Sequence, residues 1–156
     1  MAFDKAKKYL DEKGFGDRVK EFEVSSATVE LAALAVGTEP ARIAKSLTFM
    51  AKGVPTMIIC AGDVKVNNGK YKHIFGEKAR MLTRDEVHEL IGHDVGGVCP
   101  FGINDGVDVF LDESLKRFDI VYPACGSDNS AVKLTPEELE KLANSKQWID
   151  VCVPME

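Results

Sequence analysis

The most constraining feature of this chain is a seven-residue run, residues 96–102, that contains three glycines and one proline. Glycine adopts backbone conformations that other residues avoid, and it lets a ligand or another chain segment approach the main chain closely. Pro100 fixes its own φ and removes one N–H donor. The run therefore predicts a sharply bent loop, which either binds a ligand through its backbone or connects a helix to a strand.

A second unusual feature is a lysine within an apolar strand. Residues 43–50 have the composition of a β-strand, and alternation by two places Ile43, Leu47 and Phe49 on one face together with Lys45. An ammonium group in such a row must extend to the surface, find a partner, or line a cavity that receives an anionic or carbonyl group. This pattern is compatible both with a Lys45 side chain that extends to the surface and with one that binds a ligand.

Length and composition indicate a single domain, residues 1–156. The 156 residues are 45% hydrophobic, which is enough for one core. The N-terminal residues show no apolar stretch of the kind found in a secretion signal, and no later segment is long enough to cross a bilayer. We therefore expect a soluble, cytoplasmic protein with no membrane partner.

The four cysteines lie far apart and form no metal-binding pattern, so we expect reduced thiols, no metal site and no cofactor. Cys60 and Cys152 lie in apolar runs and are expected to be small buried side chains. Cys99 lies in the glycine-rich run and could act as a nucleophile if one of the chain's histidines were next to it.

The net charge of −5 is unusual for a protein that binds nucleic acid, because phosphate-binding proteins are normally basic on at least one face. The charge is uneven, however, and residues 63–84 contain six cations and two acidic residues. This segment is the predicted phosphate-contacting surface, with an ordinary solvated surface as the alternative. Its cations are Lys65, Lys70, Lys72, Lys78, Arg80 and Arg84.

Helix and strand signals alternate along the chain without a linker or repeat. The expected helices cover residues 3–13, the stretch from Ser26 or Thr28 to Gly37, a stretch capped by Asn68, the stretch from Thr83 to Gly92, and a stretch that begins at Thr135. For Asn67-Asn68-Gly69 a hairpin turn is the alternative to the helix start, which we favour. The expected strands cover residues 18–25, 43–50, 55–61, 107–111, 118–125 and 148–153. This order, without strict βαβ repetition, predicts an α+β fold.

Three motifs together resemble the YbaK and prolyl-tRNA-synthetase-associated editing domains. They are the segment 41–49, which contains Lys45, the run 96–102, and Ala124-Cys125-Gly126-Ser127 followed by residues 134–139. The similarity extends from about Thr28 to Leu142 in the order of the family. It implies a mixed, partly open β-barrel surrounded by helices, with a pocket at the mouth of the barrel. It also implies a deacylase that hydrolyses the ester of mischarged tRNA in trans.

The resemblance assigns the catalytic role to Lys45, as a cation that orients the substrate carbonyl or a terminal phosphate. Attack by a water that the ribose hydroxyl of the substrate activates, or by a cysteinyl thiol, is implied in place of a protein base. The implied substrate-binding residues are Gly96, Gly97, Cys99, Pro100, Phe101, Gly102, Gly126, Ser127, Asp128, Asn129 and Ser130.

The implied partners are aminoacyl-tRNA and a synthetase such as prolyl-tRNA synthetase, and no DNA. The sequence lacks the histidine that alanine-editing members carry in the second glycine loop, and it has Ala131 near the place where cysteine-editing members carry an acid. The choice between Ala-tRNA(Pro) and Cys-tRNA(Pro) therefore stays open. The alternatives are a non-catalytic module that binds tRNA or a synthetase, and a Cys99-dependent hydrolase.

Overall fold

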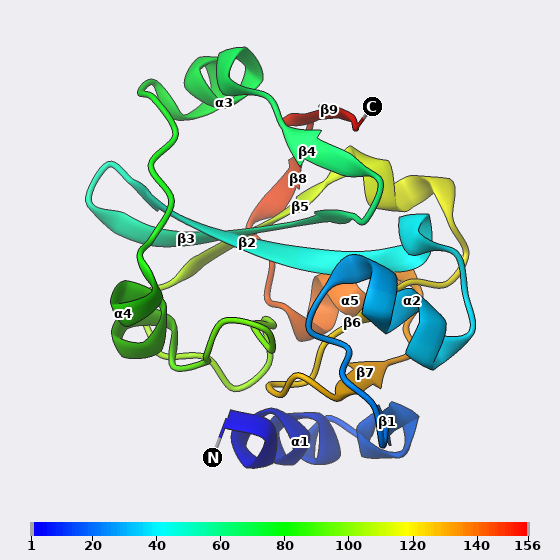
Figure 1. Cartoon of the computed structure of the whole chain (residues 1–156). Coiled ribbons are helices and arrows are strands. Elements are labelled where there is room, and N and C mark those ends of the chain that lie inside the picture. The colour runs from blue at the N-terminus through cyan, green and yellow to red at the C-terminus, as the bar shows by residue number, and fades with distance from the viewer. Residues whose placement is uncertain (1, 156) are drawn as a thin grey trace.

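The computed structural model describes residues 2–155, and Figure 1 shows how its elements are arranged. The helices are α1 (Ala2–Glu12), α2 (Val29–Val36), α3 (Asn68–Phe75), α4 (Arg84–Glu86) and α5 (Pro136–Leu142). Short helical segments are η1 (Gly16–Arg18), η2 (Pro40–Arg42) and η4 (Glu113–Arg117), and η3 (Val87–Ile91) is a π-helical turn that continues α4. The strands are β1 (Val19–Glu21), β2 (Ile43–Ala51), β3 (Val54–Ala61), β4 (Val64–Val66), β5 (Asp108–Asp112), β6 (Tyr122–Pro123), β7 (Ser130–Val132), β8 (Gln147–Ile149) and β9 (Cys152–Pro154).

A mixed five-stranded sheet, in the order β6-β2-β3-β5-β8, forms the centre of the described chain. β2 and β3 form an antiparallel hairpin, whereas β6, β5 and β8 join the sheet by parallel pairing. The antiparallel ribbons β1–β7 and β4–β9 complete the pairing. In the view of Figure 1, α3 lies above the β2–β3 hairpin, and α1, α2 and α5 lie below it. This curled mixed sheet with helices outside confirms the predicted α+β fold.

The core is built around β3. Residues 56–61 of this strand are buried, because β2 and β5 pair with its two edges and other elements cover both faces. The strand predicted over residues 55–61 is confirmed, and it is the central strand of the five. Tyr71 of α3 packs into the same core, with its ring 5.2 Å from that of Phe49 and 4.5 Å from that of Phe75.

Side-chain caps begin four of the described helices, α2, α3, α4 and α5. Thr83 and Thr135 each form a complete capping box, in which the hydroxyl accepts a backbone N–H three residues on and the glutamate there accepts the N–H of the threonine. The Asn-Asn-Gly segment begins a helix, as predicted, but the cap is Asn67, whose side chain accepts the Lys70 N–H at 2.9 Å. These local signals fix the helix starts before any tertiary contact is considered.

Thr28 and Gly37 bound α2, as the sequence predicts, and the leucines of this helix are exposed. Leu31 is 41% exposed and Leu34 is 79% exposed, whereas Ala32 and Ala33 are buried. The helix is apolar around most of its circumference, so its sequence does not distinguish one face from another.

Two predicted strands are shorter in the structure than expected. The strand predicted over residues 18–25 is β1, which pairs only along the three residues of β7. The strand predicted over residues 118–125 is reduced to β6, because only Tyr122 and Pro123 pair with β2. The C-terminal segment forms two short strands that pair separately, β8 with β5 and β9 with β4.

Candidate functional site

A cleft of about 280 Å³ lies between β2, the start of α2 and two loops, and we name it the Lys45 cleft. Lys45 provides its only charged side chain within the described residues. Gly96 comes from the first glycine-rich loop, residues 96–102, and Ser130 and Ala131 come from the start of β7, where the second loop, residues 126–130, ends. The remaining lining residues are Ser26, Ala27, Thr28, Val29, Ala32, Ile43, Ala44, Ser46, Leu47, Thr48, Met81, Leu82, Val87, Val95, Val98, Tyr122 and Ala124.

The two glycine-rich loops are in direct contact. A Cβ atom at Gly97 would lie 2.5 Å from the backbone nitrogen of Ser127, so no larger residue fits there without a shift. Gly126 has φ +79°, and a Cβ on it would lie 2.5 Å from the carbonyl oxygen of Ala2 at the start of α1. The glycines therefore let two loops and a helix pack backbone against backbone beside the cleft.

Polar side chains hold the second loop in shape. The Ser127 and Ser130 hydroxyls are 2.6 Å apart, and the Ser127 hydroxyl also donates to Asn129 Oδ1 at 2.9 Å. Asn129 Nδ2 donates to the Phe22 carbonyl at 3.1 Å, which ties the loop to the end of β1. Asp128 is exposed, and its carbonyl accepts the backbone N–H of Ser26 at 2.5 Å. Of this loop's implied site residues, Ser130 lines the Lys45 cleft, whereas Gly126, Ser127, Asp128 and Asn129 lie outside its lining.

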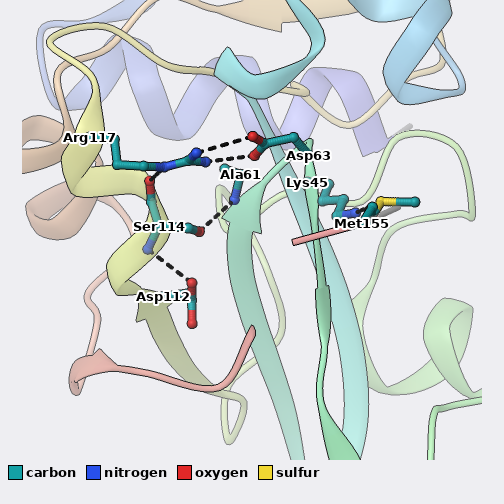
Figure 2. Close-up of polar contacts among 7 residues, drawn as sticks. All are labelled: Lys45, Ala61, Asp63, Asp112, Ser114, Arg117 and Met155. Carbon is teal, nitrogen blue, oxygen red and sulfur yellow. Dashed lines mark hydrogen bonds and ion pairs between the residues drawn. The ribbon is translucent and has the colours of Figure 1, made fainter. Parts of the chain in front are cut away.

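The ammonium of Lys45 has a weak partner. It is partly buried and donates to the thioether sulfur of Met155 at 3.7 Å, as Figure 2 shows. A thioether is a poor acceptor, so a substrate oxygen could replace it with little loss. Lys45 therefore lines the cleft, while its ammonium lies against Met155, which does not line the cleft, and forms no hydrogen bond to a carboxylate among the described residues.

A polar cluster near Lys45 fixes the end of β3 (Figure 2). Arg117 donates to both carboxylate oxygens of Asp63, at 2.6 and 3.1 Å. This pairing lowers the pKa of Asp63 from its ordinary value, and the charge of Lys45 contributes less to the same shift. The Ser114 hydroxyl accepts the Ala61 N–H at 3.1 Å, so η4 and β3 are joined at the same point.

Part of the β2 edge at the cleft has no strand partner within residues 2–155. β6 pairs with β2 only at Ile43 and Ala44, and the Leu82 N–H donates to the Thr48 carbonyl at 3.0 Å further along. Ser46 lies between these contacts. Its hydroxyl oxygen and that of Ser26 are buried without a hydrogen-bond partner. Such unsatisfied groups in a cleft suit a polar ligand, and the sequence pattern did not single out either serine.

Cys99 and Phe101, which the resemblance implied as substrate-binding residues, do not line the Lys45 cleft. Both are completely buried, and the Phe101 ring stacks on Tyr9 at 6.4 Å. Pro100 and Gly102 border a separate hollow next to Tyr9. This half of the first loop packs into the core and supports the half that reaches the cleft.

The Cys99 thiol is not set up as a nucleophile. Its sulfur is 3.4 Å from His93 Nε2, which itself lies 2.8 Å from the Phe101 carbonyl oxygen. Burial raises the pKa of the Cys99 thiol far above its ordinary value and lowers the pKa of His93. A neutral thiol and a neutral imidazole are therefore favoured, which is the reverse of an activated pair. All four cysteines are free and buried.

The predicted cationic segment is divided among different elements. Lys65 lies on β4, Lys70 and Lys72 lie on α3, Lys78 and Arg80 lie in the following loop, and Arg84 begins α4. Lys70 binds Asp150 at 2.9 Å, and Arg80 binds both carboxylate oxygens of Glu86. α3 and α4 are well separated in Figure 1, so these six cations do not converge on one point. Only the part around Met81 and Leu82 borders the Lys45 cleft.

Within residues 2–155, no group of three His, Cys, Asp or Glu side chains has an arrangement that could hold a metal ion. No helix in the described part of the chain has the length and apolar character needed to span a bilayer.

The sequence and the structure were compared with known proteins. A family model described as an aminoacyl-tRNA editing domain matches residues 23–142. The uncharacterized protein YwhH of Bacillus subtilis is 56% identical over 135 residues, which is 86% of each chain. Proline–tRNA ligase of Bacillus cytotoxicus is 26% identical over 149 residues, which is 95% of this chain and 25% of the ligase. A crystal structure of a candidate trans-editing enzyme for prolyl tRNA synthetase superposes with a TM-score of 0.87 and 33% identity, over 96% of both chains.

Proposed function

Because this chain belongs to the family of aminoacyl-tRNA editing domains, we propose that it is a deacylase that hydrolyses the ester of mischarged tRNA in trans. The observation that supports this most directly is the Lys45 cleft, which is lined by Lys45 and by residues of both loops, and in which the lysine donates no hydrogen bond to a carboxylate among the described residues. A tRNA substrate would also place the protein in the cytoplasm.

The proposed role of Lys45 follows from the chemistry of ester hydrolysis. Attack on the ester carbonyl creates a tetrahedral oxyanion, and a donor or cation at that point lowers the barrier. The ammonium of Lys45 can supply this charge or hold the terminal phosphate of the substrate. No carboxylate or imidazole lines the cleft among the described residues, so we propose that a ribose hydroxyl of the substrate activates the attacking water, or that a cysteinyl substrate attacks through its own thiol.

The substrate also needs hydrogen-bond donors besides Lys45. The N–H of Gly97 already donates to the Asp94 carbonyl at 3.0 Å, so it is not available to an oxyanion in this conformation. The buried hydroxyls of Ser26 and Ser46, which lack partners, are better candidates to contact the substrate.

The size of the cleft favours a small aminoacyl group. Pockets for drug-sized ligands occupy roughly 300–1,000 Å³, and the Lys45 cleft has about 280 Å³. Alanine and cysteine both fit this description, and tRNA(Pro) is the proposed carrier because prolyl-tRNA ligases share the domain. Lys78 and Arg84, both exposed and beside the segment that contains Met81, are proposed to contact phosphates of the tRNA.

The test is a panel of aminoacyl-tRNAs with small and large side chains, incubated with the wild type and with Lys45→Ala. The wild type is expected to deacylate at least one small aminoacyl-tRNA, and Lys45→Ala should lower kcat/KM by about 10²- to 10³-fold. Lys8→Ala is the matched control, since Lys8 is exposed on α1 and lies outside the cleft. Binding without any hydrolysis would instead identify a non-catalytic module.

A further inference from the structure

A second hollow adjoins the Lys45 cleft, and none of the features above accounts for it. It has a volume of about 470 Å³ and lies between the β1–β7 ribbon and the end of α2, so we name it the ribbon hollow. Tyr122 and Ala131 line both the ribbon hollow and the Lys45 cleft. The two spaces are therefore neighbours that share one wall.

The pairing of β1 with β7 concentrates positive charge in this hollow. Lys20 lies opposite Ala131, and the Lys133 N–H donates to the Arg18 carbonyl at 3.3 Å. By alternation, Arg18, Lys20 and Lys133 share one face of the ribbon, with Lys20 and Lys133 as diagonal neighbours. Three cations therefore line one hollow of a chain whose net charge is −5. Among the described residues, Glu21 is the only acidic residue that lines it.

The three cations differ in whether they have partners. Arg18 donates to both carboxylate oxygens of Glu138, at 2.9 and 3.0 Å, and stacks on Phe15 with its guanidinium carbon 5.0 Å from the ring centre. Lys20 and Lys133 are exposed, and neither forms an ion pair with another described residue. Arg18 therefore stabilises the structure, and the two lysines are left to bind an anion.

Two aromatic residues, Phe22 and Tyr122, line the hollow together with these lysines. A cationic groove with aromatic side chains is the combination by which proteins bind single-stranded nucleic acid, because the cations follow the phosphates and the rings stack on bases. An isolated surface lysine pair would bind an anion without preference, whereas this arrangement favours a nucleotide.

Resting on the proposed function, we propose that the ribbon hollow binds the phosphodiester backbone and a base of the single-stranded 3′ end of the tRNA, just before the nucleotide whose ester enters the Lys45 cleft. Lys20 and Lys133 contact the phosphate, and Phe22 provides a surface for the base. The RNA strand then passes Tyr122, and its terminal nucleotide reaches Lys45. The hollow thereby adds affinity for the RNA and does not take part in the chemistry.

The test uses the double variant Lys20→Gln/Lys133→Gln in the full-length protein. Its kcat/KM for aminoacyl-tRNA should fall at least about tenfold, mainly because KM rises. The slope of log(kcat/KM) against log[salt] should also become shallower by about one unit. Its kcat/KM for an aminoacyl ester of adenosine, which has no backbone phosphate, should equal that of the wild type. Lys8→Gln/Lys141→Gln removes the same charge from exposed positions outside both spaces and should change neither value.

A binding measurement separates this proposal from the proposed function. The probes are an RNA hairpin with a single-stranded CCA end and the same hairpin with a blunt end. The wild type should prefer the CCA hairpin, and the double variant and Phe22→Leu should both lose that preference. A double variant that retains the preference, or that loses activity on the adenosine ester, would overturn the ribbon hollow as an RNA site. A wild type that hydrolyses neither substrate but shows the preference would overturn the deacylase alone.

Discussion

Gly97 lies against the backbone of Ser127, so the two glycine-rich loops meet without an intervening side chain. The contact involves residues 30 positions apart in the sequence. One loop delivers Gly96 to the Lys45 cleft and the other delivers Ser130. This close approach therefore helps to set the positions of Gly96 and Ser130 in the cleft.

We predict that Gly97→Ala reduces both stability and deacylation. A Cβ there would lie 2.5 Å from the Ser127 nitrogen and 2.7 Å from its Cα, and separating two backbone segments should cost about 1–3 kcal/mol in the free energy of unfolding. Urea denaturation measures this cost. Gly106→Ala is the control, since its φ of +87° adds strain of about 1–2 kcal/mol but its Cβ meets open space. Equal deacylation by both variants would contradict the role of the loop contact.

Removal of the Cys99 thiol should leave the chemistry intact. The sulfur is completely buried beside His93 and Phe101, outside the Lys45 cleft. We expect Cys99→Ala to lower the free energy of unfolding by about 1–2 kcal/mol, measured by urea denaturation. Below its melting temperature the variant should retain the deacylation rate of the wild type. Burial raises the pKa of this thiol, so iodoacetamide should not alkylate it in the folded protein at pH 8. Loss of turnover with an unchanged fold would support the thiol-dependent hydrolase instead.

The sequence predicts the parts of this fold that depend on local chemistry. The capping boxes at Thr83 and Thr135 need only residues within one turn of the helix, and the buried β3 follows from a continuous apolar run. Lys45 was identifiable because it interrupts an apolar row, and the structure places it in one cleft with Gly96 and Ser130.

The features that the sequence does not reveal depend on which segments become neighbours. In the sequence, Ser46 has the pattern of an ordinary strand residue. It lies at an unpaired part of the β2 edge because β6 pairs with β2 only at Ile43 and Ala44. Lys20 and Lys133 share a hollow only because β1 pairs with β7. Phe101 lies within the glycine-rich loop, and nothing in the motif distinguishes a residue that faces the cleft from one that packs on Tyr9.

Ser46→Ala should separate ligand binding from stability. The Ser46 hydroxyl is buried without a partner in the free protein, so its removal should leave the free energy of unfolding unchanged or slightly higher. If the substrate satisfies this hydroxyl, KM for aminoacyl-tRNA should rise by about 5- to 30-fold, the value of one hydrogen bond. Ser114→Ala is the contrasting variant, because the Ser114 hydroxyl accepts the Ala61 N–H and its loss should destabilise the fold. An unchanged KM for Ser46→Ala would exclude the hydroxyl from substrate binding.

Acidic pH should weaken the start of α4 through Glu86. Hydrogen bonds from Arg80 and then from Thr83 lower the pKa of Glu86 from its ordinary 4.5 to about 2. A carboxyl group with a lowered pKa in the folded state stabilises the protein above its unfolded pKa, and this contribution disappears as the pH falls through the folded pKa.

Glu86→Gln keeps an acceptor for the Thr83 N–H but loses the charge that pairs with Arg80. The urea midpoint of the wild type should therefore exceed that of Glu86→Gln at pH 6, and the difference should shrink steadily between pH 4.5 and pH 2. Glu89→Gln removes the same charge from an exposed position on η3 whose side chain forms no hydrogen bond or ion pair with another described residue, and its difference from the wild type should not follow this course. A constant difference between wild type and Glu86→Gln across this range would show that the Arg80 pairing does not stabilise the helix.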